Sequence, residues 1–408
     1  MTRAYVWSDL WGAPRLVGAI EVEGNVGEFR YAPAYIAERG PALDPRNLPV
    51  GEQALHTRAN GGLFGVLSDA GPDAWGRRVL ANLHPKRMAK PSALQVLLLA
   101  SGTGVGALMF SQSKDSVKPR PAPPAPEDLG AAAEGMHAVE QGRPMRQQLQ
   151  LLLEAGSTLG GVNPKIAVAS NKGAWIAKFR AADDIADTPR IEAACLQLAR
   201  RCGIDALDAR HTAIGQRSCI MLPRFDRQAS GQVKHYASAH ALWNRERLNP
   251  GRDYLEWASY MGIADLLREH VSIEPRQDCE ELFRRMIFNV VLGNTDDHGK
   301  NHGFLMDAEG HWRLAPAFDL VPPVGGQATQ QALGIGAEGT LRTWSNALSM
   351  ATRFLPSQSR AAQAAQDIAQ TVARNYAELL DRHGVSVIDR ELALGRALLP
   401  AGITLRSG

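Results

Sequence analysis

A proline-rich segment near residue 120 limits what this chain can fold into. Five of the nine residues from Lys118 to Pro126 are proline. Proline donates no backbone hydrogen bond and favours extended geometry, so the segment is predicted to lie outside any helix or sheet. We therefore expect an N-terminal domain over residues 1–115, a linker over residues 116–140 and a larger C-terminal unit. This division of the chain is within the usual range of domain sizes.

The composition narrows the class of protein. The 408 residues favour two or three domains, and the 45% hydrophobic and 21% charged residues are typical of a soluble globular protein. A net charge of +3 is too small to indicate nucleic-acid binding by itself. No apolar run is long enough to cross a membrane, Met1–Tyr5 has no signal-peptide pattern, and the four cysteines lack Cys-x-x-Cys spacing. These features predict a cytoplasmic protein without membrane contact.

The N-terminal domain is predicted to mix strands and helices. Short strands are expected at Val6, 16–20 and 29–31, with a turn and helix start within 68–78 and a second helix from Ser92. The run Gly102–Gly106 is one glycine short of a dinucleotide fingerprint, because Ala107 stands at the third position. A β-turn leading into a strand at 107–110 is the preferred interpretation, and nucleotide binding is the alternative.

The C-terminal unit is predicted to divide into two lobes. Apolar β-like runs at 165–169, 174–179 and 219–222 surround one helix at 191–202, whereas a long amphipathic helix at 358–383 stops at Gly384. The fold class expected is α+β: the mixed N-terminal domain followed by a bilobal domain. Its small sheet-rich lobe would cover residues 141–235 and its larger all-helical lobe residues 236–408.

Two short passages carry the strongest functional signal. They read Asn294-Thr295-Asp296-Asp297-His298-Gly299-Lys300-Asn301 and Ala317-Phe318-Asp319-Leu320. An Asp followed five residues later by an Asn, with a second Asp downstream, is the arrangement of a kinase catalytic loop. In that arrangement Asp296 accepts the proton of the attacking hydroxyl, while Asn301 and Asp319 hold magnesium. Lys300 is a candidate for neutralising charge on the transferred phosphoryl group.

The first passage also allows other interpretations. Paired aspartates are common in turns and helix caps, and His298 beside them could belong to a zinc site. Gly293–Lys300 is one residue too long for a Walker A loop, and Asn301 replaces its Ser or Thr. That mismatch argues against a P-loop NTPase.

Residues further upstream favour a nucleotide site. In the loop from Ser157 to Lys165, Gly160 and Gly161 would let backbone amides approach phosphate oxygens, and Lys165 adds positive charge. Lys178, at the end of a β-like run, and Glu192, on the next helix, are candidates for the Lys–Glu pair that orients the phosphates. The alternatives are an exposed strand-end lysine and a glutamate favoured by the helix dipole.

The passages at 293–301 and 317–322 resemble the HipA family of bacterial serine/threonine kinases, the toxins of toxin–antitoxin pairs. The segment Asp73–Arg77 is similar to that family's N-terminal domain, and Arg224–Arg227 is similar to its lobe-joining segment, with Pro223 in place of a Glu. The resemblance implies a protein-kinase-like fold for the bilobal domain, with ATP and Mg²⁺ as cofactors and a protein substrate, such as an aminoacyl-tRNA synthetase. It also implies autophosphorylation of the glycine-rich loop at Ser157 or Thr158. The partner implied is a small helix-turn-helix antitoxin (HipB-like), through which operator DNA is mainly bound.

Two other functions are compatible with the sequence. A small-molecule phosphotransferase of the aminoglycoside type shares an Asp and an Asn five residues apart, but the separate N-terminal domain argues against it. A non-catalytic pseudokinase subunit of a repressor complex is the third hypothesis. The presence of every acidic and basic candidate in the chain argues against that one.

Overall fold

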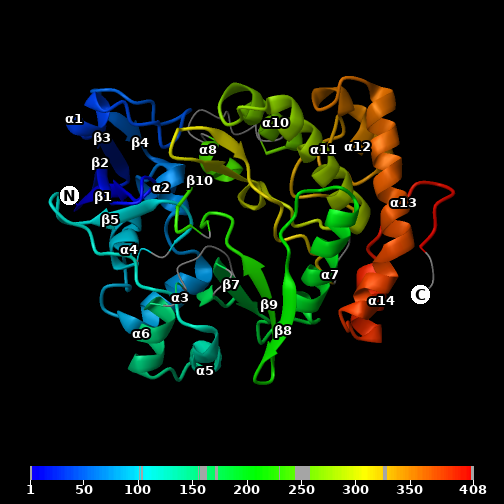
Figure 1. Cartoon of the computed structure of the whole chain (residues 1–408), viewed down its shortest axis with the longest axis horizontal. Helices are drawn as coiled ribbons and strands as arrows, with labels where there is room; N and C mark the ends of the chain where they lie inside the picture. Colours follow the sequence, from blue (N-terminus) through cyan, green and yellow to red (C-terminus); the bar gives the residue numbers. More distant parts are fainter. Residues whose placement is uncertain are drawn as a thin grey trace.

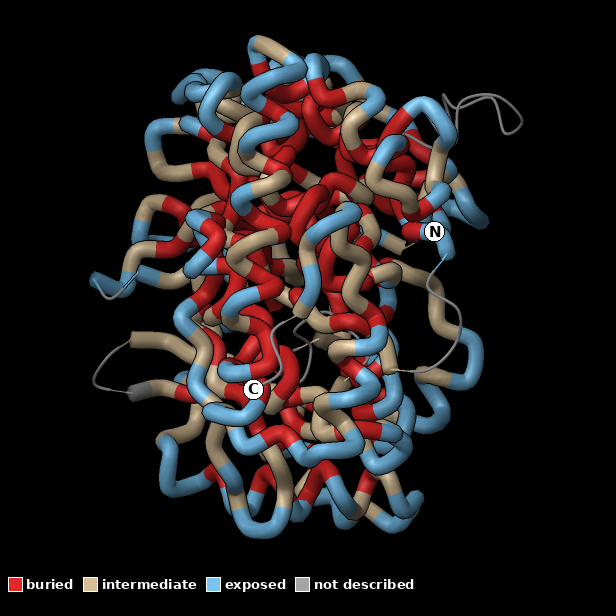
Figure 2. Tube along the Cα trace, turned by 90° about the vertical axis from the view of Figure 1, so that its right-hand side faces the viewer, coloured by how far each residue is buried: buried red, intermediate tan, exposed pale blue. Residues whose placement is uncertain are grey.

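The computed structural model of the chain places an N-terminal α/β domain beside a bilobal unit (Figure 1). The structure describes residues 2–100, 102, 104–154, 156, 163–170, 173–228, 230–243, 258–324 and 329–405. Figure 2 shows buried residues running through the interior of all these parts. Within the described ranges, no helix is both long and apolar enough to cross a bilayer.

The N-terminal domain is built on a five-stranded antiparallel sheet. Its strand order is β4-β3-β2-β1-β5, with β1 (Thr2–Ser8), β2 (Arg15–Glu23), β3 (Val26–Tyr31), β4 (Leu55–Thr57) and β5 (Leu108–Ser111). Its helices are α1 (Pro33–Ala37), α2 (Gly65–Asp69), α3 (Ala74–Leu83) and α4 (Ala93–Leu99). The expected strands and both expected helix starts are therefore confirmed, and Ser92 begins α4 as a capping box with Gln95.

The small lobe contains a four-stranded antiparallel sheet and one long helix. The strand order is β6-β7-β9-β8, with β6 (Lys165–Ser170), β7 (Gly173–Phe179), β8 (Arg210–Ile214) and β9 (Arg217–Pro223). The helix α7 (Thr188–Arg201) packs against this sheet, and a helical hairpin of α5 (Leu129–Glu140) and α6 (Arg146–Glu154) lies to its lower left in Figure 1.

The predicted linker over residues 116–140 needs a correction. Residues 116–125 have neither helix nor strand, but α5 takes up 129–140. The reason is that α5 has apolar residues at helical spacing, which bury themselves with α6 and with Trp75 and Val79 of α3 in one core. The proline segment also contacts the sheet, because the carbonyl of Pro124 accepts a hydrogen bond of 3.0 Å from the amide of Ala169.

The second lobe is mainly helical. Its elements are α8 (Ala239–Leu242), α10 (Tyr260–Glu269), α11 (Pro275–Leu292), α12 (Trp344–Ser349), α13 (Gln358–Arg382) and α14 (Val387–Leu394). The expectation of an all-helical lobe needs one correction, because β10 (His235–Ser238), β11 (Gly303–Met306) and β12 (Trp312–Leu314) form a three-stranded sheet. All four residues of β11 are buried, so their pattern lacks the alternation that would mark a strand.

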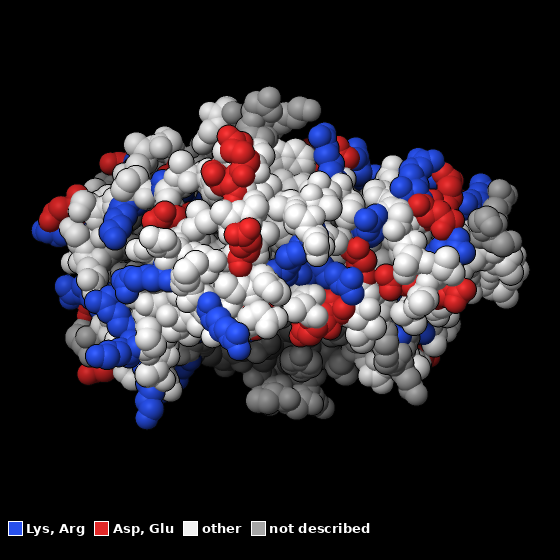
Figure 3. Space-filling view, turned by 90° about the horizontal axis from the view of Figure 1, so that it is seen from below, with Lys and Arg blue, Asp and Glu red and all other residues white. Residues whose placement is uncertain are grey.

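Surface charge is distributed unevenly. On the face shown in Figure 3, Lys and Arg side chains predominate toward the left end, whereas positive and negative side chains are mixed toward the right end, where Figure 1 places α13 and α14.

Candidate active site

The predicted catalytic loop begins where α11 ends. Gly293 terminates this helix with a φ of 83°, the left-handed conformation that glycine adopts without strain. A Cβ at this position would lie 2.6 Å from the backbone oxygen of Arg396, so a larger residue would also collide with the chain. The loop that follows leaves Asp296 exposed and buries Asp297.

A buried polar network holds this loop in place. The Asp297 carboxylate accepts a hydrogen bond from the hydroxyl of Tyr260 on α10, and it lies 2.8 Å from Nε2 of His302. The Tyr260 hydroxyl accepts a bond of 3.1 Å from Nδ2 of Asn289 on α11, and Oδ1 of Asn289 accepts one of 3.1 Å from Asn294. Sequence reasoning missed this network, since nothing in the local pattern of Tyr260 or Asn289 marks them as partners of a distant loop.

Lys178 joins the small lobe to the second acidic motif. Its Nζ, on β7, lies 2.8 Å from Oε2 of Glu192 on α7 and 2.6 Å from Oδ1 of Asp319. The Glu192 side chain is almost completely buried, whereas 40% of the Asp319 side chain is exposed. The structure therefore brings together three residues that sequence reasoning placed in one nucleotide site.

The backbone around Asp319 fixes its carboxylate near α7. The amide of Ala317 donates a bond of 2.7 Å to the carbonyl of Asp205, and the amide of Leu207 donates one of 3.1 Å to the carbonyl of Ala317. Asp319 itself has a φ of 57°, a left-handed conformation that Asp and Asn tolerate better than other residues with a side chain. Nδ2 of Asn294 lies 3.4 Å from the Asp319 carbonyl, which ties the two acidic motifs together.

The charges of these groups shift one another's pKa. The Lys178 ammonium holds the pKa of Asp319 down at about 2, against the opposing effect of burial. Burial lowers the pKa of Lys178, but the carboxylates of Asp319 and Glu192 outweigh it and keep this pKa above its usual value. Burial raises the pKa of Asp296, and repulsion from Asp319 adds to the effect while His298 opposes it. Asp296 and Asp319 thus act on each other electrostatically across one site.

Lys165 lies beside this cluster. It pairs with Lys178 across the β6–β7 ladder. Burial and the nearby charge of Lys178 together lower the pKa of Lys165 to about 8, although Asp319, Glu192 and Asp73 act in the opposite direction. An anion bound beside Lys165 would stabilise the protonated form of this lysine, so the site favours a negatively charged ligand.

Lys300 and Asn301 occupy different surroundings. Nζ of Lys300 lies 2.7 Å from Oδ1 of Asp73, the N-cap residue of α3, so this lysine contacts the N-terminal domain. Asn301 is buried, and its backbone amide donates a bond of 2.8 Å to the carbonyl of His298. The predicted loop residues Ser157, Thr158, Gly160 and Gly161 lie outside the described residues.

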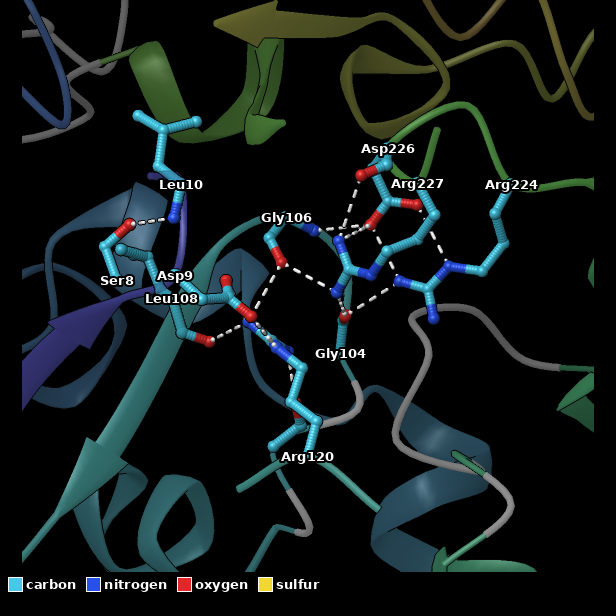
Figure 4. A network of polar contacts seen from close by, with 11 residues as sticks. Ser8, Asp9, Leu10, Gly104, Gly106, Leu108, Arg120, Arg224, Asp226 and Arg227 are labelled. Atoms are coloured by element: carbon cyan, nitrogen blue, oxygen red, sulfur yellow. Dashed lines mark hydrogen bonds and ion pairs between the residues drawn. The ribbon is translucent and has the colours of Figure 1, made fainter. Parts of the chain in front are cut away.

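A buried network of arginines and aspartates joins the lobes to the N-terminal domain (Figure 4). Asp226 accepts bonds of 2.7 Å from Arg224, 3.0 Å from Arg227 and 2.8 Å from the amide of Gly106. The guanidinium of Arg227 also donates to the carbonyl of Gly106 over 3.0 Å. The described residues of the Gly102–Gly106 run are bends, and Gly106 bonds to the lobe-joining segment. In an adjoining network, Arg120 of the proline segment lies 2.7 Å from Asp9.

Phe225, within the same lobe-joining segment, contacts the second acidic motif. Its ring centroid lies 5.4 Å from that of Phe318, the residue before Asp319, and 5.9 Å from that of Tyr236. The segment that joins the lobes therefore packs on both the N-terminal domain and the loop that carries Asp319.

Comparison with known proteins supports this architecture. Residues 8–111 match the family described as HipA N-terminal domain, and residues 157–376 match the HipA-like C-terminal domain. "Putative kinase Y4mE" of Sinorhizobium fredii is 25% identical over 354 residues, covering 82% of this chain and 81% of that protein. A "Putative kinase" of Haemophilus influenzae is 32% identical over 104 residues, which cover 25% of this chain and 30% of that protein.

A solved structure shows the same fold. HipA from Shewanella oneidensis MR-1, in the complex of the toxin–antitoxin proteins HipA and HipB with operator DNA, superposes with a TM-score of 0.65. The two chains are 17% identical, and the match covers 94% of this chain and 93% of the other. With both domain matches and this fold, the chain belongs to the HipA family.

Proposed function

We propose that this chain is an ATP- and Mg²⁺-dependent serine/threonine protein kinase that acts as the toxin of a toxin–antitoxin pair. The observation that carries the proposal is the contact of Lys178 with both Glu192 and Asp319. A lysine paired with a helix glutamate and an aspartate that binds metal are the parts that a kinase uses to hold nucleotide phosphates. The relatives named as putative kinases support the same class of activity.

Asp296 is the proposed general base. It is exposed at the turn of the loop, so an acceptor hydroxyl can reach it, and its raised pKa makes it a stronger base than an ordinary aspartate. The neighbouring Asp297 is unsuited to this role, because its carboxylate is buried and already bonded to Tyr260 and His302.

The remaining residues fit an ATP–magnesium complex. Magnesium is usually held through one or two carboxylates together with phosphate oxygens, and Asp319 and Asn301 would supply a carboxylate and an amide oxygen for it. When bound, the ion neutralises phosphate charge. Lys178 and Lys165 would face the phosphates, which explains why two lysines are held side by side on β6 and β7. Lys300 would reach the transferred group only after leaving Asp73.

The test is phosphoryl transfer from radiolabelled ATP with magnesium to the chain itself and to proteins of a cell lysate. We expect Asp296→Asn to lower the rate by at least about 100-fold, as removal of a catalytic base does. Asp367→Asn, an exposed change on α13, is the matched control and should transfer at the wild-type rate. Equal transfer by wild type and Asp296→Asn would remove Asp296 from this role, and nucleotide binding without any transfer would indicate a non-catalytic subunit.

Self-control and partners are part of the proposal. Phosphate on Ser157 or Thr158 of the glycine-rich loop would add negative charge to this loop and limit activity. Mass spectrometry after incubation with ATP should find phosphate at one of these positions and none in a Ser157→Ala, Thr158→Ala double variant. Phosphate found only elsewhere in the chain would contradict this assignment.

The antitoxin partner is proposed from the solved HipA structure, which was determined with HipB and operator DNA. We infer that a small helix-turn-helix protein binds this chain and provides most of the DNA contact. In a gel-shift assay with operator DNA, the chain should retard DNA only when that protein is present. Retardation of equal strength by the chain alone would contradict the inference.

A further inference from the structure

We propose that Arg342 is a positioning residue for the loop of residues 293–301, because its guanidinium fixes the end of α11 from which this loop starts. Arg342 lies outside the acidic motifs and the candidate nucleotide site, and nothing in the local sequence marks it. Its effect on catalysis rests on the proposed function, whereas its effect on the loop can be measured without phosphoryl transfer.

The last carbonyls of α11 take their donors from distant parts of the chain. The carbonyls of the final four residues of a helix have no partner within the helix. In α11, the carbonyl of Val290 accepts a bond of 2.9 Å from Nε of Arg342, and the carbonyl of Val291 accepts one of 2.8 Å from the amide of Leu398. These two contacts complete the helix just before Gly293, where the loop begins.

The guanidinium of Arg342 also bridges α11 to the C-terminal segment. Its Nη2 donates over 2.6 Å to the carbonyl of Arg396. A Cβ at Gly293 would lie 2.6 Å from the same carbonyl oxygen and 3.2 Å from Nη2 of Arg342. The glycine therefore makes room for both groups. Arginine suits the bridge, because its planar fork can donate to two acceptors at once.

The charge of Arg342 matches its place at the end of a helix. Only 9% of this residue is exposed. Burial and the charge of Arg396 lower the pKa of Arg342 to about 10, so the guanidinium still carries its proton at neutral pH. A cation at the C-terminal end of a helix is stabilised by the partial negative charge of the carbonyls there. Its hydrogen bonds are charge-assisted and hence stronger than bonds between neutral groups.

The backbone around Arg342 reaches the loop by a second route. The amide of Arg342 donates a bond of 2.9 Å to the carbonyl of Thr329, and the chain next to these two residues pairs in antiparallel fashion. The amide of Ala332, on the same paired segment, donates one of 3.0 Å to the carbonyl of Thr295. Thr295 directly precedes Asp296, so one segment holds both the helix end and the loop.

Asp296 thus lies between two anchors. On its C-terminal side, the carboxylate of Asp297 is held by Tyr260 and His302. On its N-terminal side, the anchor is the cap that Arg342 places on α11. Without this cap the last turn of α11 would fray, because a buried carbonyl would lose its donor. Asp296 would then lose its fixed position, while the lysines of the small lobe would keep theirs.

Hydrogen exchange of the full chain, followed by mass spectrometry, tests the anchor directly. The amides of Gly293, Asn294 and Thr295 each donate to a backbone carbonyl, so they are expected to exchange slowly in wild type. Arg342→Met should speed their exchange by about tenfold or more, the usual effect of losing a hydrogen bond from a charged group. Arg342→Lys keeps the charge but lacks the planar fork, so it should give a smaller increase.

Arg313→Met is the matched control. Nη2 of Arg313 bonds over 2.9 Å to Asp278 in the first turn of α11, at the end of the helix away from the loop. Both Arg313→Met and Arg342→Met remove a charged contact from α11, but only the second should speed exchange at residues 293–295. The melting temperature of each variant shows whether it is folded at the temperature of the measurement.

Phosphoryl transfer from ATP measures the consequence for the reaction. Arg342→Met should lower kcat by about tenfold or more, because a small misplacement of a catalytic group is costly. The KM for ATP should stay within about twofold of wild type, because the proposed nucleotide contacts of the small lobe are unchanged. Arg313→Met should keep the kcat of wild type.

Two results would overturn the proposal. The first is exchange at residues 293–295 that is unchanged in Arg342→Met or equally fast in Arg313→Met. The second is faster exchange in Arg342→Met with the kcat of wild type, which would show that the anchor does not serve the reaction. Absence of transfer by wild type would instead contradict the proposed function, and the exchange rates would still decide whether Arg342 fixes the loop.

Discussion

Asp296 and Asp297 are adjacent in sequence, yet the fold gives their carboxylates different properties. Asp297 is buried and bonded to Tyr260 and His302, while Asp296 is exposed with a raised pKa. From the sequence alone, only the spacing of five residues to Asn301 favoured Asp296 over Asp297 as the general base. The hydrogen-bond partners of Asp297 are Tyr260 of α10 and His302 at the end of the loop, and no local sequence pattern predicts these contacts.

A pH profile tests the surroundings of Asp296. A general base must be deprotonated, so the rate of transfer should fall as pH falls through its raised pKa. His298 lowers this pKa, so His298→Gln should move the acid limb of kcat/KM to higher pH. An unchanged acid limb in this variant, with transfer otherwise intact, would show that another group controls the profile.

Lys178 was predicted to pair with Glu192, and the structure adds Asp319 as a second partner, 141 residues away in the chain. We expect Lys178→Met to lower the free energy of unfolding by about 3 kcal/mol, because the nearly buried Glu192 would lose its countercharge. Urea unfolding measures this change, with the exposed Lys114→Met as control. A loss equal to that of the control would show that the pair contributes no stability.

Among the elements, α3 and the proposed catalytic loop form a contact that the sequence did not suggest. Asp73 begins α3 and its carboxylate pairs with Lys300, and the apolar face of α3 packs with α5 and α6. The helix itself was predictable from its apolar spacing. Its docking partners were not, because periodicity identifies a buried face and says nothing about what covers it. The same limit explains why α5 was assigned to the linker.

The Asp73–Lys300 pair can be measured by a double-mutant cycle with Asp73→Asn and Lys300→Met. Both side chains are partly exposed, so a coupling energy of about 0.2–1 kcal/mol in stability is expected. If the pair also positions the catalytic loop, the two changes will be non-additive in kcat. Strict additivity in both measurements would show that the contact has no energetic role.

At the scale of the whole molecule, the buried network around Asp226 is one of several contacts that hold the N-terminal domain to the lobes; the ion pair of Asp73 with Lys300 is another. Burial alone would raise the pKa of Asp226, but Arg224 and Arg227 outweigh it and hold this pKa well below the usual range. Because the pKa is lowered on folding, the stabilisation is present at neutral pH and is lost as pH falls through the folded-state value. The network lies at the glycine run that the sequence predicted to be a turn, whereas its partners in Arg224–Arg227 were recognised only as a lobe-joining segment.

Substitution of Asp226 tests this junction. Asp226→Asn should lower the free energy of unfolding by about 3 kcal/mol at pH 7, because two buried guanidiniums lose their shared carboxylate. The deficit should shrink below about pH 4, where the unfolded aspartate takes up its proton. Exposed Asp115→Asn is the control, and a deficit that is the same at pH 7 and pH 3 would contradict the electrostatic explanation.

The proposed function requires nucleotide to bind beside the contact of Lys178 with Asp319, with Asn301 close enough to share its metal ion. A crystal structure of the chain with magnesium and a non-hydrolysable ATP analogue tests this most directly. We predict phosphate oxygens within hydrogen-bond distance of Lys178, a magnesium ion bound by Asp319 and Asn301, and the terminal phosphate facing Asp296. A nucleotide bound elsewhere, or a metal without either of these two ligands, would contradict the account.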